Sequence, residues 1–273
     1  MNEFMRRFFD SAPTHPRDRA RRSLGSGFLI NAEGLIVTNR HVIEDASEIT
    51  VVLDDGRSFP AVLQGEDDKT DLALLKINAA NGQPFPYVEF GDSSLARVGD
   101  WVLAIGNPFG LGGTTTSGII SARGRNINSG PYDDYIQVDA PINQGNSGGP
   151  LFNTKGKVIG VNTAIFSPNG GNVGIGFAIP ANVVTEIVAS LEIHGKVQRA
   201  WLGIQIQPVT PAIAESFNRN EAGGVLVSAV NPDSPAARAI EQLARRLFYQ
   251  TVGDASRSNF FGRLWPPSKF KAA

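Results

Sequence analysis

The sequence has 273 residues, of which 41% are apolar and 19% are charged, so a chain that is disordered over its whole length is excluded. Its 25 lysines and arginines nearly balance 26 aspartates and glutamates, and this balance provides no general attraction for nucleic acid. The absence of cysteine excludes disulfides, thiol nucleophiles and thiolate metal sites.

The beginning of the chain is polar and carries no targeting signal. Phe4, Phe8 and Phe9 lie among charged residues, without the apolar centre of a signal peptide. Four arginines follow within 17–22. We expect residues 1–24 to form a flexible, solvated segment, and we place any export signal outside this sequence. No apolar run approaches the ~20 residues of a membrane span, so we expect no such span.

Residues 25 to about 177 predict β-structure, because short apolar runs alternate there with glycine, asparagine and aspartate turns. The first group of predicted strands is 27–30, 36–38, 49–53, 59–63 and 72–77. The second group is 101–105, 116–121, 136–138, 150–152, 157–161 and 176–179. We predict an all-β fold of two six-stranded antiparallel barrels, at about 25–95 and 99–180.

From residue 182 the sequence predicts a helix, and after the helix its residue pattern changes. Apolar residues recur at helical spacing over 182–194, with Asn182 placed to cap the start and Gly195 the end. We therefore place one domain at 25–197. A β-like segment at 198–239 follows, and residues 240–273 form an arginine-rich, then aromatic tail that does not continue its pattern.

The clearest chemical signal is the segment NQGNSGGP at 143–150. Glycines around Ser147 let the backbone turn tightly and leave the hydroxyl accessible. Amides of this segment, those of Gly145 and Ser147 first, can converge on one small space as an oxyanion hole. A glycine-rich β-turn without chemistry is the alternative.

A base for this serine has few candidates, because the chain has three histidines. His15 and His194 lie in a charged segment and at a helix end, whereas His41 follows a predicted strand, on a turn. Imidazole has an ordinary pKa of ~6.5 and accepts a hydroxyl proton near neutral pH. Asp71 directly precedes the strand 72–77, so we expect its carboxylate to be partly buried and to need a hydrogen-bond donor. His41 can supply that donor, and the carboxylate then orients the imidazole.

These segments resemble the HtrA/Do-like (DegP-type) family of trypsin-fold serine proteases. The likeness rests on TNRHV at 38–42, TDLAL at 70–74 and GNSGGP at 145–150, and further matches lie at 25–27, 106–110 and 174–180. It implies His41 as base, Asp71 as orienter and Ser147 as nucleophile. It also implies an oxyanion hole at Gly145, Asn146 and Ser147, and no metal or organic cofactor.

The residues around the serine loop bear on specificity and activation. In digestive relatives the residue before the serine is an aspartate, which forms an ion pair with the new N-terminus after the precursor is cleaved. Asn146 cannot form that ion pair, so activation by N-terminal trimming is disfavoured. We expect the substrate to contact two segments, and their apolar surface favours small or medium aliphatic residues before the scissile bond. The residues of these segments are Ile142, Asn143 and Gln144 in the first, and Ile175, Gly176 and Phe177 in the second.

The segment after the helix resembles part of a PDZ domain. Trp201, Leu202, Gly203 and Ile204 are similar to a PDZ carboxylate-binding loop and first strand, which hold a peptide C-terminus on backbone amides. Only about 40 residues of a module of ~90 are recognisable, too few to close a core alone.

Two functions remain open at this point. The first is a serine endopeptidase that cleaves unfolded or misfolded proteins through an acyl-enzyme, in envelope quality control. The second is a non-proteolytic, chaperone-like or peptide-binding protein, inactive through loss of the PDZ region. The resemblance implies the bacterial periplasm or cell envelope, unfolded polypeptides as partners, and a homotrimer or larger homo-oligomer that uses Phe4, Phe8 and Phe9.

Overall fold

The computed structural model describes residues 25–78, 82–107, 113–143, 145–167, 171–219 and 221–251, without the side chains of 244–251. The chain divides into two compact units, Met1–Gln198 and Arg199–Ala273. The predicted segments at 1–24 and beyond 251, with Phe4, Phe8 and Phe9, lie outside the described residues. Among the described residues, no helix has the length and apolarity needed to cross a bilayer.

The first sheet of unit Met1–Gln198 has five strands in the order β1-β2-β5-β4-β3, and every neighbouring pair is antiparallel. Its strands are β1 (Gly27–Leu29), β2 (Leu35–Asn39), β3 (Ile49–Val52), β4 (Ser58–Asp67) and β5 (Leu72–Ile77). Among the residues that the structure describes, this half has five strands and not the predicted six-stranded barrel, because β1 and β3 do not pair with each other.

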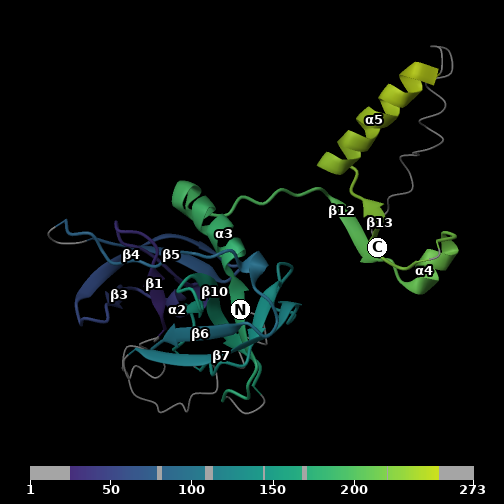
Figure 1. Ribbon diagram of the computed structural model, residues 1–273. Helices are drawn as coiled ribbons and strands as arrows, with labels where there is room; N and C mark the ends of the chain where they lie inside the picture. Colours follow the sequence, from purple (N-terminus) through teal and green to yellow (C-terminus); the bar gives the residue numbers. More distant parts are fainter. Residues whose placement is uncertain are drawn as a thin grey trace, which may run out of the picture. The chain divides into compact units, whose positions relative to one another are not determined.

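The second sheet is a closed barrel of six strands in the order β10-β11-β8-β7-β6-β9, as predicted. Its strands are β6 (Trp101–Gly106), β7 (Thr114–Arg125), β8 (Tyr135–Val138), β9 (Pro150–Asn153), β10 (Val158–Ile165) and β11 (Gly176–Pro180). Every residue of β10 is buried, because this strand faces the barrel interior on one side and helix α3 and the first sheet on the other. The purple-to-blue first sheet and the teal-to-green barrel lie side by side (Figure 1).

Helix α3 (Ala181–His194) joins the two sheets into one body. Val184, Ile187 and Leu191 are buried in a single apolar cluster with residues of both sheets, such as Leu72 and Val161. Gly195 ends the helix in the left-handed conformation at φ +68°, as predicted. Asn182 does not cap the start. Its side chain instead contacts Asp92 and the Ser93 amide.

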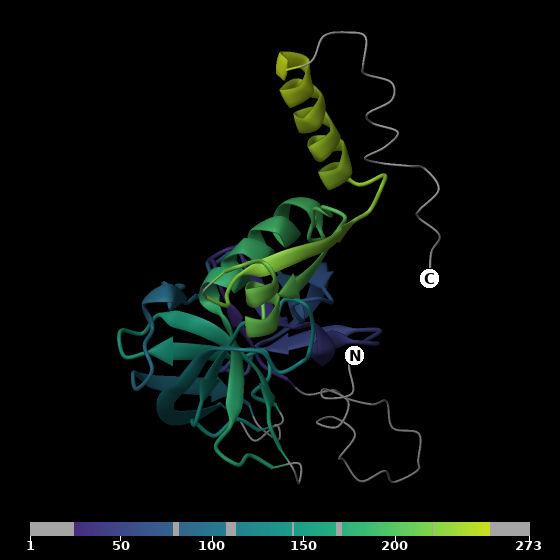
Figure 2. The ribbon, with the colours of Figure 1, turned by 90° about the vertical axis from the view of Figure 1, so that its right-hand side faces the viewer.

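Unit Arg199–Ala273 contains a two-stranded antiparallel sheet of β12 (Ile204–Pro208) and β13 (Val225–Val230) with two helices, α4 (Pro211–Ser216) and α5 (Pro235–Thr251). Few of its side chains are buried, among them Ala214 and Ser234. The yellow helix α5 runs without a break in Figure 2. It therefore continues across position 240, where the sequence pattern changes.

Candidate active site

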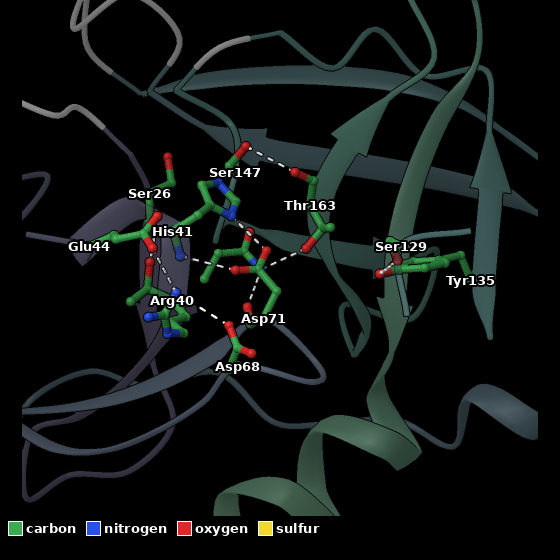
Figure 3. Close-up of polar contacts among 12 residues, drawn as sticks. Ser26, Arg40, His41, Glu44, Asp68, Asp71, Ser129, Tyr135, Ser147 and Thr163 are labelled. Carbon is green, nitrogen blue, oxygen red and sulfur yellow. Dashed lines mark hydrogen bonds and ion pairs between the residues drawn. The ribbon is translucent and has the colours of Figure 1, made fainter. Parts of the chain in front are cut away.

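His41 and Asp71 meet because β2 and β5 are neighbours. β2 ends at Asn39, which is paired with Leu72, so the residues that follow β2 lie beside the residue that precedes β5. His41 is the second residue of a short helix, α2 (Arg40–Ile43), and not part of a turn. Its Nδ1 lies 2.6 Å from Asp71 Oδ2, and its backbone N–H donates to Asp71 Oδ1 at 3.0 Å (Figure 3). The carboxylate thus fixes both the imidazole and the helix that carries it.

The backbone at Asp71 is held in an uncommon conformation. Its φ is +56°, in the left-handed region that aspartate tolerates better than most residues. Its carbonyl oxygen accepts two hydrogen bonds, from the Arg40 amide at 3.1 Å and from Asn39 Nδ2 at 2.8 Å. Surrounding contacts therefore determine the direction in which this carboxylate points.

Ser147 lies in a tight loop between β8 and β9. Glycines at positive φ flank it, Gly145 at +99° and Gly148 at +85°. The Ser147 carbonyl accepts from the Ser26 amide at 2.8 Å, and its Oγ donates to the Thr163 carbonyl at 3.2 Å. Ser147 lies beside the His41 ring, with Asp71 on the other side of that ring (Figure 3).

The amides of the serine loop differ in what they bind. The Asn146 amide donates to the Asn143 carbonyl at 3.0 Å, so the expectation that Asn146 contributes to an oxyanion hole is wrong for this conformation. Within the described part of the chain, the amides of Gly145 and Ser147 have no acceptor. Those two N–H groups are therefore the ones free to hold an oxyanion.

One relation in the site was not predicted from sequence. Asn39 is fully buried, and its Nδ2 donates to Thr163 Oγ1 at 2.6 Å as well as to the Asp71 carbonyl. Thr163 in turn accepts from Ser147 Oγ through its carbonyl. Asn39 lies in the TNRHV motif, which was a signal that could have found it. Thr163 carries no motif, and no signal in the sequence pointed to it.

The first predicted specificity segment falls partly outside the described residues. Ile142 is fully buried, and Gln144 lies outside the described part of the chain. A Cβ at Gly176 would come within 2.8 Å of Ile142 Cδ1, so glycine at 176 is what leaves room for Ile142. The structure thus brings Ile142 and Gly176 into direct contact.

The second predicted specificity segment, residues 175–177, is largely buried. Phe177 is 5% exposed and belongs to the core cluster, where its ring packs against Tyr135 at 6.2 Å. Its side chain is therefore part of the core, and a role of Phe177 in binding substrate stays a prediction. Ile175 is partly buried against the same cluster, and its carbonyl accepts from the Phe166 amide at 3.0 Å.

Tyr135 is a titratable group whose pKa the fold shifts. Burial raises its pKa to about 12, although its hydroxyl lies 2.8 Å from Ser129 Oγ. Ser129 also donates to Asp133 Oδ1 at 2.5 Å. In the described ranges, no three histidine, aspartate or glutamate side chains are grouped closely enough to hold a metal ion.

Comparison with known proteins decides the family. Residues 25–161 match the model of the trypsin-like peptidase domain. This chain belongs to the trypsin-like peptidase family. Among curated relatives, a probable periplasmic serine endoprotease, DegP-like, of Rhizobium meliloti is 58% identical over 227 residues, which cover 82% of this chain and 45% of the relative. A protein of the same name from Brucella suis is 57% identical and covers 83% of this chain and 44% of the relative.

Solved structures place this trypsin-like peptidase among the HtrA type. The HtrA-type protease AlgW with a decapeptide is 50% identical, with a TM-score of 0.70 over 79% of this chain and 66% of that one. A serine endoprotease from Yersinia pestis is 44% identical, with a TM-score of 0.62 over 81% of this chain and 71% of that one. The chain spans less than half the length of the curated relatives above.

The predicted carboxylate-binding loop of this HtrA-type chain lies just before and at the start of β12. Gly203 has a φ of +73°, and its carbonyl accepts from the Asn231 amide at 2.8 Å. The Leu202 carbonyl accepts from the Ala236 amide, near the start of α5, at 3.1 Å. Trp201 and Leu202 are 61% and 59% exposed. A role of Trp201, Leu202, Gly203 and Ile204 in binding a peptide carboxylate stays a prediction.

Proposed function

We propose that this chain is a serine endopeptidase that cleaves unfolded or misfolded polypeptides. The observation that carries the proposal is the 2.6 Å pairing of His41 Nδ1 with Asp71 Oδ2, at an imidazole whose other side faces Ser147 (Figure 3). A carboxylate in this position fixes the imidazole tautomer that exposes Nε2 as a proton acceptor. Membership of the trypsin-like peptidase family supports the same assignment.

In the proposed mechanism, Ser147 Oγ attacks the carbonyl carbon of the scissile peptide while His41 Nε2 takes the hydroxyl proton. Negative charge then develops on the former carbonyl oxygen, which the amides of Gly145 and Ser147 stabilise. His41 returns the proton to the leaving amine, and the acyl-enzyme is left. A water molecule, deprotonated by His41, hydrolyses this ester and regenerates Ser147.

The contact from Ser147 Oγ to the Thr163 carbonyl bears on the first of these steps. The hydroxyl must leave this acceptor and turn toward the imidazole before it can attack. Such a turn about one side-chain torsion costs little, because the competing hydrogen bond is long at 3.2 Å. We therefore interpret the contact as the resting position of the nucleophile.

We propose that small or medium aliphatic residues precede the scissile bond. Ile142 and Gly176 contact each other next to the serine loop and carry no charge. A lysine or arginine there would lack a buried partner, which is costly in an apolar site. Mass-spectrometric mapping of the cleavage sites in casein should give mostly Val, Ala or Ile before the cut. A majority after basic residues would contradict this specificity.

Location and assembly follow from the relatives by analogy. The DegP-like relatives are named periplasmic, and we propose the bacterial periplasm or cell envelope for this chain too. The AlgW structures hold peptides, which agrees with a polypeptide substrate. We further propose a homotrimer or larger homo-oligomer, which light scattering on the purified chain would test.

The decisive experiment is covalent labelling with a fluorophosphonate, which reacts with activated serines. The unmodified chain should be labelled and should degrade casein, and Ser147→Ala should do neither. Ser228→Ala, which changes an exposed serine of unit Arg199–Ala273, is the matched control and should behave as the parent. An unlabelled parent chain that still binds casein would favour the non-proteolytic, peptide-binding function.

A further inference from the structure

The turn between β4 and β5 carries Asp71 at its end, and the sheet fixes both ends of this turn. Leu72, the first residue of β5, pairs with Asp67 of β4 on one side and with Asn39 of β2 on the other. Residues 68–71 form the turn that connects the two paired strands. Because the sheet determines only where the turn begins and ends, the conformation of the turn itself decides where the carboxylate of Asp71 points.

Inside this turn, a buried carboxylate holds the residue that precedes Asp71. Asp67 Oδ2 accepts two hydrogen bonds from Thr70, one from its backbone N–H at 3.0 Å and one from its hydroxyl at 2.6 Å. Asp67 is 6% exposed and Thr70 is 7% exposed. Aspartate is rarely buried without hydrogen-bond partners, because removing its charge from water is costly. These two bonds to a single residue fix the backbone that leads into Asp71.

Asp71 requires support of this kind because of its backbone conformation. Its φ of +56° is one that residues other than glycine keep only where the surrounding structure imposes it. Asn39 and Arg40 hold the carbonyl group of Asp71. The contact between Asp67 and Thr70 holds the peptide on the other side, since Thr70 directly precedes Asp71. With both of its sides fixed, the Asp71 carboxylate is directed at the imidazole.

We propose that Asp67 and Thr70 are positioning residues of the catalytic site, which hold the turn so that Asp71 meets His41. The inference rests on the proposed peptidase function, because it assigns the turn a role in the same triad. Asp67 and Thr70 take no part in the proton transfer and act through Asp71, whose carboxylate bonds to both Nδ1 and the backbone N–H of His41. A misplacement of about 1 Å in such a group is enough to lower a rate by ~10²-fold.

The test measures kcat and KM for hydrolysis of a short peptide by the full chain. Asp67→Ala removes the acceptor of both bonds and should lower kcat by ~10- to 100-fold, with KM within ~3-fold of the parent. Thr70→Val removes only the hydroxyl and keeps the shape of the side chain, so it should lower kcat by about 10-fold, whereas Thr70→Ser keeps the hydroxyl and should stay within ~3-fold of the parent. A Thr70→Val variant as active as Thr70→Ser would contradict the proposal, even if Asp67→Ala does not fold.

Asp92→Ala is the matched control for Asp67→Ala. Asp92 Oδ1 accepts from the N–H and the hydroxyl of Ser94 at 2.8 Å and 2.6 Å, which is the same pair of bonds in a turn without a triad residue. Both alanine variants should unfold at a lower temperature than the parent, because each loses two hydrogen bonds to a carboxylate. Asp92→Ala should keep the kcat of the parent. Similar losses of kcat in the two variants would show a general effect of stability and would overturn the positioning role.

Proton NMR gives a readout that does not depend on hydrolysis. The proton on His41 Nδ1 lies in the 2.6 Å contact with Asp71 and should resonate at low field, because short charge-assisted hydrogen bonds deshield their protons. This resonance should be the same in the parent and in Thr70→Ser, and it should shift or disappear in Asp67→Ala. An unchanged resonance in Asp67→Ala would refute the positioning role. A parent chain that fluorophosphonate does not label would instead contradict the proposed peptidase function, and the NMR comparison would still test the turn.

Discussion

Asn39 Nδ2 donates to Thr163 Oγ1 over 2.6 Å and so joins the last residue of β2 in the first sheet to β10 in the second. The same nitrogen donates to the carbonyl of Asp71. Because Thr163 O also accepts from Ser147 Oγ, this buried amide links the backbone of Asp71 to the residue that holds the Ser147 hydroxyl. Asn39 touches none of the reacting atoms and is a positioning residue.

Replacement of Asn39 by aspartate should reduce kcat at little change in KM. Aspartate has the same shape, but its carboxylate cannot donate to Thr163 or to the Asp71 carbonyl. Loss of two buried hydrogen bonds should lower the free energy of unfolding by about 1–3 kcal/mol. Denaturant unfolding and steady-state peptide hydrolysis measure the two effects. Asn126→Ala, an exposed asparagine, is the control. A fall in stability with unchanged kcat would leave Asn39 a purely structural residue.

Asp71→Asn should lower the rate of peptide hydrolysis by about 10⁴, because the amide can leave the imidazole in the wrong tautomer. The fold should survive, since asparagine also tolerates the positive φ of this position. Circular dichroism checks the fold, and hydrolysis of a short peptide checks the rate. Asp68→Asn changes a neighbouring exposed carboxylate that pairs with Arg40, and it should retain most of the activity. Comparable losses in the two variants would contradict the role of Asp71.

Gly148→Ala should disrupt the nucleophile loop, and Gly156→Ala should not. Both glycines have positive φ, +85° and +70°, so both variants carry the cost of a left-handed alanine, about 1 kcal/mol. At Gly148 the new Cβ would collide with the Ser26 carbonyl and the Thr38 hydroxyl, whereas at Gly156 it meets nothing within 4 Å. Thermal unfolding should show the larger loss for Gly148→Ala, with loss of fluorophosphonate labelling. Equal unfolding temperatures of the two variants would show that the loop moves to accommodate the new Cβ at 148, and would contradict this prediction.

Tyr135 should lose its proton only in strongly alkaline solution. Burial raises its pKa to about 12 from an ordinary value of 10.0. Between pH 10 and pH 12, Tyr135 is mostly deprotonated in the unfolded chain and mostly protonated in the folded chain. The free energy of unfolding therefore falls as pH rises, by at most ~1.4 kcal/mol per pH unit. Below pH 10 the stability linked to this proton is fully present.

Tyr135→Phe provides the comparison for this titration. The stability difference between the parent and the phenylalanine variant should shift against the parent from pH 10 upward. The tyrosinate absorbance that the variant lacks should develop near pH 12. A midpoint near 10 for that absorbance would mean that Tyr135 is open to water.

The sequence alone determined the element types and the local chemistry of this protein. Alternating apolar runs predicted eleven strands close to those observed, and helical spacing predicted α3. The glycines around Ser147 and the aspartate before β5 identified the candidate triad, because a positive φ favours particular residue types locally. The accessible hydroxyl expected at Ser147 is not observed, since this residue is buried. The family resemblance from three short motifs was confirmed by the comparisons.

Only the tertiary structure decided how these elements close and which groups remain free. Strand number did not reveal that β1 and β3 do not pair with each other, since closure depends on what lies across the sheet. The use of the Asn146 amide inside its own loop, and the burial of Phe177 against Tyr135, follow from backbone and core geometry. Asn39 and Thr163 are 124 positions apart, and no local pattern encodes a hydrogen bond between strands of two sheets, because it forms only once both sheets pack on the shared apolar cluster.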